Sequence, residues 1–294
     1  MRALVTGAFG FLGSAISTGL ERDGWTVVRT GRPRTEIPSP AFESLLERSE
    51  PSLVVHCAGP ASVPASVADP EADRRGSVDV LSSVLDRLAA LSVPPRVLLI
   101  SSAAVYGQPE RLPVRETDPL TPISPYGRNR VACESLVREY ASVAPAAALR
   151  VFSAYGEGLA RQLLWDVSQK ALARKPLVLA GTGKESRDFI HADDVAQAVA
   201  CVARREPRDT EIYNVATGRQ LTVAELAALL LAALGIEGEV SFSGRARPGD
   251  PERWQADVSR IGSLGFEPAV AIGEGVRRYA AWVSAYASAS TAPR

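Results

Sequence analysis

Three glycines at a regular spacing mark a turn near the start of the chain that could hold phosphate. The segment Gly7-Ala8-Phe9-Gly10-Phe11-Leu12-Gly13 follows an apolar run and opens a helical pattern. A strand, turn and helix of this kind bring backbone N–H groups and a helix N-terminus against a pyrophosphate. The spacing differs from G-x-G-x-x-G, and a tight turn without a ligand is the alternative. The predicted dinucleotide contacts are Gly7, Phe9, Gly10, Phe11, Leu12 and Gly13.

Two arginines stand at the end of the second apolar run, where many dinucleotide-binding folds carry an acidic residue for the ribose 2′-hydroxyl. The chain reads Val27-Val28-Arg29-Thr30-Gly31-Arg32 and has no carboxylate there. Guanidinium groups favour a 2′-phosphate by charge and by bidentate geometry. We therefore expect Arg29 and Arg32 to clamp NADP(H), with NAD(H) as the alternative. Solvated turn arginines in an Arg-rich chain are the simpler interpretation.

The elements that must position these residues alternate between strand and helix. Strands are predicted at residues 2–6, 25–29, 53–57, 96–101, 147–152 and 211–215, and helices at residues 11–23, 40–49, 77–91, 125–141, 159–174, 191–203, 222–234 and 273–285. This alternation predicts an α/β fold, a Rossmann-type doubly wound parallel sheet. Because the rhythm loosens after Phe152, we expect a dinucleotide-binding domain at 1–153. A smaller, discontinuous C-terminal substrate lobe would follow at 154–294, with the chain returning to the first domain around 188–216.

Composition and charge exclude several classes of protein. The 294 residues carry a net charge of zero, without the basic footprint of a nucleic-acid binder. Cys57, Cys133 and Cys201 lie far apart without metal-ligand spacing, so we predict reduced thiols and no metal site. The sequence opens without a signal-peptide layout, and its longest apolar stretch is too short to span a bilayer. We predict a cytoplasmic protein with no membrane partner.

Five motifs, in order, resemble those of the extended short-chain dehydrogenase/reductase family, the NAD(P)-dependent nucleotide-sugar epimerases, dehydratases and reductases. They are residues 6–13, Ser101-Ser102-Ala103-Ala104-Val105-Tyr106-Gly107, Ser124-Pro125-Tyr126-Gly127-Arg128-Asn129-Arg130, Arg187-Asp188-Phe189-Ile190-His191-Ala192-Asp193-Asp194-Val195 and Arg247-Pro248-Gly249-Asp250. The match spans nearly the whole chain, and five ordered motifs are far more specific than one glycine turn.

By this resemblance Tyr126 is the catalytic tyrosine, Ser102 its hydroxyl partner, and Arg130 stands where the family has lysine. Hydride transfer at a carbinol carbon needs a group that takes or gives the proton of its oxygen. A phenol with an ordinary pKa of about 10 does this near neutrality only beside a cation. Arg130 keeps the charge, but its planar fork makes the exchange non-conservative. Core packing for Tyr126 and a strand-end cap for Ser102 are the alternatives.

The resemblance also implies contacts to both ligands. On the cofactor side they are Ala58, Gly59, Ser101, Tyr126 and Arg130, and on the substrate side Ser102, Ala103, Tyr126, Ser153, Arg187 and Arg247. Ser153 stands where the family usually has asparagine. Arg187 and Arg247 would bind a diphosphate, with salt bridges to nearby aspartates as the alternative. We expect His191 to cap a helix rather than bind a metal.

Three functions are compatible with these residues. The first is an NADP(H)-dependent oxidoreductase that reduces a keto group of a nucleotide-diphosphate sugar and is similar to the 4-keto-6-deoxy-sugar reductases. The Arg29 and Arg32 pair favours it. An NAD(P)-dependent nucleotide-sugar epimerase and a non-catalytic dinucleotide-binding protein are the alternatives. A 4,6-dehydratase is disfavoured, since Ala103 and Ala104 replace its acidic pair. The resemblance also implies a homodimer.

Overall fold

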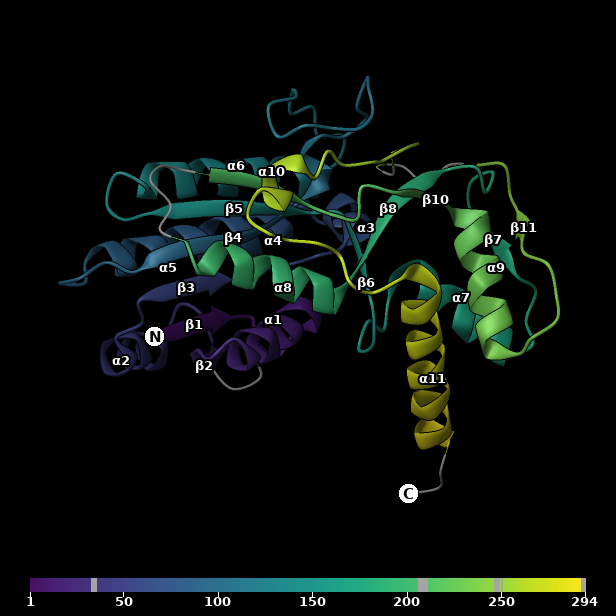
Figure 1. Cartoon of the computed structure of the whole chain (residues 1–294), viewed down its shortest axis with the longest axis horizontal. Helices are drawn as coiled ribbons and strands as arrows, with labels where there is room; N and C mark the ends of the chain where they lie inside the picture. The colour runs from purple at the N-terminus through teal and green to yellow at the C-terminus, as the bar shows by residue number, and fades with distance from the viewer. Residues whose placement is uncertain (33–35, 206–210, 246–248, 250, 292–294) are drawn as a thin grey trace.

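The computed structural model describes residues 1–32, 36–205, 211–245, 249 and 251–291. A six-stranded sheet forms its centre, with the order β2-β1-β3-β4-β5-β9 and every pair parallel (Figure 1). Its strands are β1 (Arg2–Thr6), β2 (Thr26–Thr30), β3 (Leu53–His56), β4 (Arg96–Ser102), β5 (Ala146–Val151) and β9 (Glu211–Val215). The predicted α/β, Rossmann-type fold class is confirmed.

Helices cover both faces of this sheet because its strands are apolar on both sides. Ala3 and Val5 of β1 face α1 (Phe11–Arg22) and α8 (Ala192–Ala203), while Leu4 faces the opposite layer. That second layer consists of α2 (Pro40–Ser49), α5 (Val80–Ala89) and α6 (Pro125–Tyr140). The sheet is therefore doubly wound.

The strand order reverses between β1 and β3. From β1 the chain passes through α1 to β2 at the edge, and it then returns through α2 to β3 on the other side of β1. In doubly wound sheets ligands bind at the carboxyl ends of the strands that flank such a reversal. The glycine turn after β1 and the Cys57-Ala58-Gly59 segment after β3 both lie at that point.

Local sequence explains where several helices begin. Ser39, Ser62 and Ser124 each accept the amide of the residue three positions on, and a proline occupies the first or second helical position. A serine cap satisfies an amide that would lack a partner, and the fixed φ of proline suits a first turn. At α6 this combination starts the helix at Pro125 and places Tyr126 in its first turn.

A second group of elements forms a lobe beside the sheet (Figure 1). They are a sheet of β6 (Ser153–Tyr155), β8 (Ser186–His191) and β10 (Gln220–Thr222), a pair of β7 (Val178–Leu179) and β11 (Ser241–Phe242), and helices α7 (Gln162–Leu172), α9 (Val223–Leu234) and α11 (Ile272–Thr291). The three helices share an apolar core, against which Phe11 of α1 packs. The lobe therefore borders the glycine turn.

The sheet strands and the long helices lie within a few residues of their predicted positions, whereas the lobe strands β6, β8 and β10 were missed. These strands are short and pair with partners distant in sequence. α8 packs on α1 and β9 completes the main sheet, while the domain division at residue 153 stays a prediction. None of the helices in the described ranges has the length and hydropathy needed to cross a membrane.

Candidate active site

The glycine turn after β1 is held against the residues that follow β3. A Cβ on Gly7, whose φ is +64°, would lie 2.8 Å from the backbone of Cys57 and Ala58. A Cβ on Gly13 would lie 2.1 Å from the carbonyl oxygen of Gly7, so glycine is needed for α1 to begin this close to the turn. Gly10 starts α1 without a capping side chain, and the first turn contains no acidic residue. A helix start of this kind is suited to an anion.

The end of β2 differs from the expected arginine clamp. Arg29 donates to both carboxylate oxygens of Glu21, at 2.6 and 3.0 Å, so its charge is balanced within the protein. Gly31, with φ of +127°, lies against the glycine turn, and a Cβ there would be 3.0 Å from the Gly7 nitrogen. Arg32 is exposed on the turn beyond it. Of the two predicted clamp residues, Arg29 is thus paired with Glu21, whereas Arg32 is exposed.

A buried histidine closes the end of β3. The Thr6 hydroxyl oxygen accepts the amides of Cys57 and Ala58, at 3.2 and 3.3 Å, so its own hydrogen is available to His56 Nδ1 at 3.0 Å. Burial, assisted by the positive charge of Arg130, lowers the pKa of His56 to about 3. His56 is thus a neutral structural group beside the glycine turn, as its strand-end position suggests.

The first turn of α6 carries Tyr126 against the end of β4. The Tyr126 amide donates to Ser66 Oγ on α3 (Val63–Ala68) at 3.1 Å. A Cβ on Gly127 would lie 2.5 Å from the Ala104 carbonyl oxygen, in the short helix η2 (Ala103–Val105) that follows β4. This close approach sets the first turn of α6 on η2. Tyr126 itself is only half-buried, so its phenol remains accessible.

The two serines at the end of β4 have different partners. Ser102 is half-buried, and its oxygen accepts the Ala104 amide at 3.2 Å while its hydroxyl can still donate. Ser101 is buried and donates to Glu134 of α6 at 2.6 Å. Because that hydroxyl is committed to Glu134, any cofactor contact at Ser101 would come from its backbone. Ala103, the first residue of η2, is fully buried.

Arg130 lies between Tyr126 and the turn that follows β3. Its guanidinium carbon lies 5.0 Å from the centre of the Tyr126 ring, and Nη2 donates to the Pro60 carbonyl oxygen at 3.0 Å. Gly59 has to be small here, since its Cβ would lie 3.1 Å from that nitrogen. Arg130 is 5% exposed, and its buried Nε has no partner among the described residues. Arg130, which stands where the family has lysine, thus lies between the Tyr126 phenol and the turn after β3.

An acidic residue that the sequence did not single out also contacts this helix. Asn129 donates to Asp73 Oδ2 at 2.7 Å, from α6 to α4 (Pro70–Arg74). Asp73 is buried, and its Oδ1 has no partner within the described part of the chain. Because Asp73 stands among charged residues in the sequence, its segment looks like a solvated helix face. Only the packing of α4 on α6 shows that it points inward.

The predicted substrate residues lie toward the lobe. Ser153 begins β6, half-buried and in register with Phe189 of β8. Arg187 of β8 lies over the Trp254 ring, 5.6 Å from its centre, and donates to the Ser186 carbonyl at 2.9 Å. Asp188, the salt-bridge alternative for Arg187, accepts the hydroxyl of Thr217 and the amides of Thr217, Gly218 and Ala256.

Arg247 lies outside the described residues, but one member of its motif is described. A Cβ on Gly249 would lie 2.9 Å from Val63 of α3 and 3.4 Å from Ser124, the cap of α6. This part of the Arg-Pro-Gly-Asp motif therefore borders the turn that carries Tyr126.

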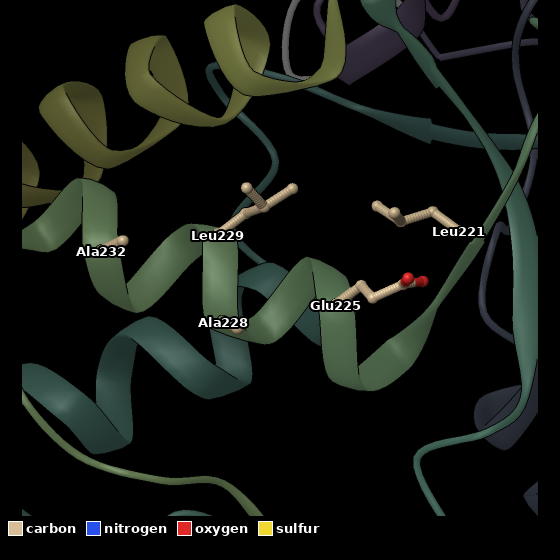
Figure 2. Close-up of a pocket in the computed structure, with 5 residues that line it drawn as sticks. All are labelled: Leu221, Glu225, Ala228, Leu229 and Ala232. Atoms are coloured by element: carbon tan, nitrogen blue, oxygen red, sulfur yellow. The ribbon is translucent and has the colours of Figure 1, made fainter.

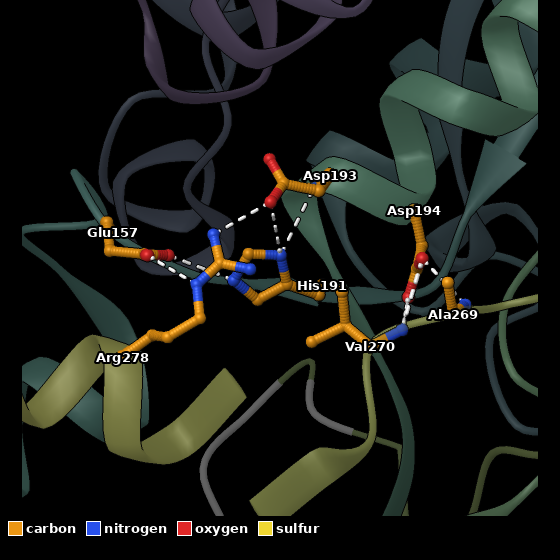
Figure 3. A network of polar contacts seen from close by, with 7 residues as sticks. All are labelled: Glu157, His191, Asp193, Asp194, Ala269, Val270 and Arg278. Atoms are coloured by element: carbon orange, nitrogen blue, oxygen red, sulfur yellow. Dashed lines mark hydrogen bonds and ion pairs between the residues drawn. The ribbon is translucent and has the colours of Figure 1, made fainter. Parts of the chain in front are cut away.

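His191 caps α8, as predicted, and belongs to a charged network (Figure 3). Its Nδ1 accepts the Asp193 amide at 3.2 Å, so Nε2 carries the hydrogen and donates to Glu157 at 2.9 Å. Arg278 of α11 bonds Glu157 at 2.8 Å and Asp193 at 2.7 Å. The network fastens α11 to the end of β8 and the start of α8, and no group of residues suited to a metal ion occurs in the described ranges.

An apolar hollow of about 440 Å³ lies elsewhere, on α9 (Figure 2). Leu221, Glu225, Ala228, Leu229 and Ala232 line it. Its one charged residue, Glu225, already accepts the Thr222 amide and hydroxyl in a capping box. With no convergent polar groups, this hollow lacks what a sugar nucleotide needs, so the candidate site is the one around Tyr126.

Comparison with known proteins agrees with this geometry. A family model described as the NAD dependent epimerase/dehydratase family matches residues 3–216. The chain belongs to this family. It is 30% identical to the UDP-glucose 4-epimerase of Mycolicibacterium smegmatis, over 95% of this chain and 97% of that one. It is 31% identical to the UDP-glucose 4-epimerase of Azospirillum brasilense, over 91% and 87% respectively.

Two solved structures show that this family member shares the relatives' fold. MoeE5 in complex with UDP-glucose and NAD superposes with a TM-score of 0.89 at 28% identity, covering 98% of this chain and all of that one. The UDP-glucose 4-epimerase of Thermus thermophilus in complex with NAD gives a TM-score of 0.86 at 28% identity, covering 97% and 99%. Sheet and lobe are therefore both part of the shared architecture.

The buried His56 predicts a pH dependence of stability. Its pKa is about 3 in the folded chain and about 6.5 when unfolded, so below pH 6.5 only the unfolded chain takes up the proton. Its contribution to stability is therefore full above pH 6.5 and is lost as the pH falls toward 3. We expect the free energy of unfolding to fall by about 2 kcal/mol more between pH 7 and 5 in wild type than in His56→Gln. Urea titrations at pH 7 and pH 5 measure the free energy of unfolding of both proteins. An equal fall in wild type and in His56→Gln would contradict the prediction.

Proposed function

We propose that this protein is a nucleotide-sugar 4-epimerase that uses NAD. The observation that carries the proposal is the position of Arg130, which lies over the Tyr126 ring and bonds the turn after β3. A proton-transferring phenol and the turn after β3, against which the glycine turn packs, are thereby brought together by one cation. The named relatives support the choice of reaction, since they are called UDP-glucose 4-epimerases.

The described residues fit a dinucleotide. Gly7, Gly10 and Gly13 leave the uncapped start of α1 open to a pyrophosphate, and the buried Nε of Arg130 is a donor that bonds none of the described residues. Buried polar atoms of this kind are normally satisfied, so a ribose hydroxyl is a suitable partner for it. Residues proposed to hold the cofactor are Gly7, Phe9, Gly10, Phe11, Leu12, Gly13, Ala58, Gly59, Tyr126 and Arg130.

The epimerase replaces the reductase that the sequence favoured. That expectation depended on Arg29 and Arg32 as a clamp for a 2′-phosphate, and Arg29 is bound to Glu21 instead. MoeE5 and the Thermus thermophilus enzyme are both described with NAD. We therefore propose NAD rather than NADP as the cofactor. The homodimer and the cytoplasmic location stay predictions.

The chemistry assigned to this chain is proton transfer and orientation at the sugar C4 oxygen. NAD, when bound, supplies reversible two-electron oxidation of the carbinol carbon. The Tyr126 oxygen would take the hydroxyl proton and return it after the configuration has inverted. The Ser102 hydroxyl would hold the same sugar oxygen by a hydrogen bond. The cation over the ring would stabilise the negative charge that the phenol oxygen carries before it takes the proton and again after it has returned it.

The substrate side is proposed to bind a uridine diphosphate sugar. MoeE5 is described in complex with UDP-glucose and with UDP-glucuronic acid, which have the diphosphate in common. Arg187 provides a guanidinium beside Trp254, and Gly249, the described residue of the Arg247 motif, lies against the Ser124 cap of α6. Arginine forks suit the paired oxygens of a diphosphate. Ser153 and Ala103 complete the proposed lining.

The reaction is tested with Tyr126→Phe, which removes the proton-carrying oxygen and keeps the ring under Arg130. We expect wild type to interconvert UDP-glucose and UDP-galactose with NAD, and the variant to lose kcat by about 10²- to 10⁴-fold. NAD affinity should stay within about threefold, which calorimetry checks. An unchanged kcat in Tyr126→Phe, or net consumption of reduced cofactor by wild type on a keto-sugar nucleotide, would contradict the proposal.

The cofactor choice is tested at Glu21. Glu21→Ala frees Arg29, so we expect the ratio of NADP to NAD affinity to rise about three- to tenfold, which corresponds to roughly 1 kcal/mol. Fluorescence titration with each cofactor measures the ratio, and wild type should bind NAD more tightly. The same change in an Arg29→Ala background serves as the control and should give no rise. Tighter binding of NADP by wild type would overturn the choice of NAD.

A further inference from the structure

A buried group of polar side chains joins the elements that carry the proposed catalytic residues. Arg150 of β5 donates Nε and Nη2 to the Glu134 carboxylate of α6, at 3.0 and 2.7 Å. Ser101 of β4 donates to the same carboxylate at 2.6 Å. Arg150 Nη1 donates to the Tyr106 hydroxyl at 2.8 Å, and Tyr106 donates to Asn214 of β9 at 2.6 Å. We call these five residues the buried polar hub, since each is at most 3% exposed.

Three members of the hub form one row across the main sheet. Ser101 pairs with Arg150, and Arg150 pairs with Asn214, in the parallel register of β4, β5 and β9. Two positions earlier, Leu99 and Ala148 belong to the core beneath α5 and α6. Because side chains alternate between faces along a strand, the row lies on the α6 side, near the carboxyl ends.

The face that α6 turns toward the sheet changes along its length. Its buried residues are Gly127, Arg130, Cys133, Glu134, Val137 and Tyr140. The last two, with Cys133, lie in the apolar core, whereas Arg130 in the first half and Glu134 just beyond the middle bury charge. Apolar burial is non-directional, so it holds the second half without orienting the first. The half that carries Tyr126 therefore depends on polar contacts of defined geometry.

We propose that Glu134 and Arg150 are positioning residues, which set Tyr126 and Arg130 relative to the end of β4. This inference rests on the proposed function, in which those two residues act. Glu134 follows Arg130 by four residues and Tyr126 by eight, so the three lie along one side of α6. A carboxylate fixed between Ser101 and Arg150 fixes the rotation of that side about the helix axis.

The ion pair contributes orientation rather than net stability. Taking two charges out of water costs about as much as their attraction returns, so apolar replacements often leave stability unchanged. The Arg150 fork, in contrast, binds the carboxylate through three N–H···O contacts between 2.7 and 3.2 Å, which restricts angle as well as distance. Removal of both charges should therefore loosen the first half of α6 without unfolding the chain.

Asn214 extends the hub toward the lobe. Its side-chain amide donates to the carbonyl oxygens of Val114 and Asp257, at 2.9 and 3.2 Å. Its backbone amide donates to the Glu116 carboxylate at 2.8 Å. Arg150 also donates to the Glu116 carbonyl at 3.0 Å. Arg150 and Asn214 therefore also hold the segment between η2 and α6, which leads into the first turn of α6.

The test replaces the pair by apolar residues, in Glu134→Leu/Arg150→Met. Its matched control is Glu43→Leu/Arg87→Met, which removes an exposed Glu–Arg pair between α2 and α5. We expect both double variants to keep a melting temperature near that of wild type. Only the hub variant should lose kcat for 4-epimerisation, by tenfold or more, with KM for the sugar nucleotide within about threefold. A kcat within threefold of wild type in a folded hub variant would overturn the inference.

A second readout needs no turnover. Arg130→Met should weaken NAD binding in wild type and in the control background, but at least threefold less in the hub variant, where Arg130 is no longer held in place. Equal effects in all backgrounds would overturn the positioning role.

If the hub variant does not fold, Glu134→Gln replaces it. We then expect kcat to fall at least threefold and the amide hydrogens of residues 126–130 to exchange faster than in wild type. A wild-type protein that does not bind NAD would overturn the proposed function itself.

Discussion

The planar guanidinium of Arg130 connects the two halves of the proposed site. It lies over the Tyr126 ring and reaches the Pro60 carbonyl, so the first turn of α6 and the turn after β3 are held at a fixed separation. Gly59 suits this place, because its φ of +128° is one that L side chains rarely adopt and a Cβ there would lie only 3.1 Å from Arg130 Nη2. A lysine would bring one compact charge to this place, whereas the arginine brings several donors in a plane. The surroundings of Arg130, a glycine and a half-buried phenol, accommodate that plane.

The backbone geometry beneath this contact follows from close packing at the sheet reversal. Gly7, Gly13 and Gly31 each lie against backbone atoms where a Cβ would stand within about 3 Å. The turns after β1, β2 and β3 are therefore packed on one another without side chains between them. This leaves the uncapped start of α1 beside the turn that Arg130 bonds. The polar hub below α6 plays the corresponding part on the catalytic side, since it aims the helix that the apolar core only holds.

Much of the sheet could be predicted from sequence, because its signals are local. Apolar runs alternating with helical patterns placed most strands and helices, and motif resemblance singled out Tyr126 and Arg130 as candidates. Contacts between segments distant in sequence left no such signal. Arg29 meets Glu21 through the packing of β2 on α1, and Asp73 becomes buried only when α4 meets α6. The short lobe strands likewise exist because distant segments pair.

Whether a guanidinium performs the part of the usual ammonium is the central question for this chain. The direct measurement is kcat for conversion of UDP-glucose to UDP-galactose, compared between Arg130→Met and wild type. Equal melting temperatures of the two proteins show that the variant is folded. The account predicts a loss of at least about a hundredfold, because the cation that stabilises the phenol oxygen is gone. A rate within threefold of wild type would contradict it and would show that Arg130 has only a structural role.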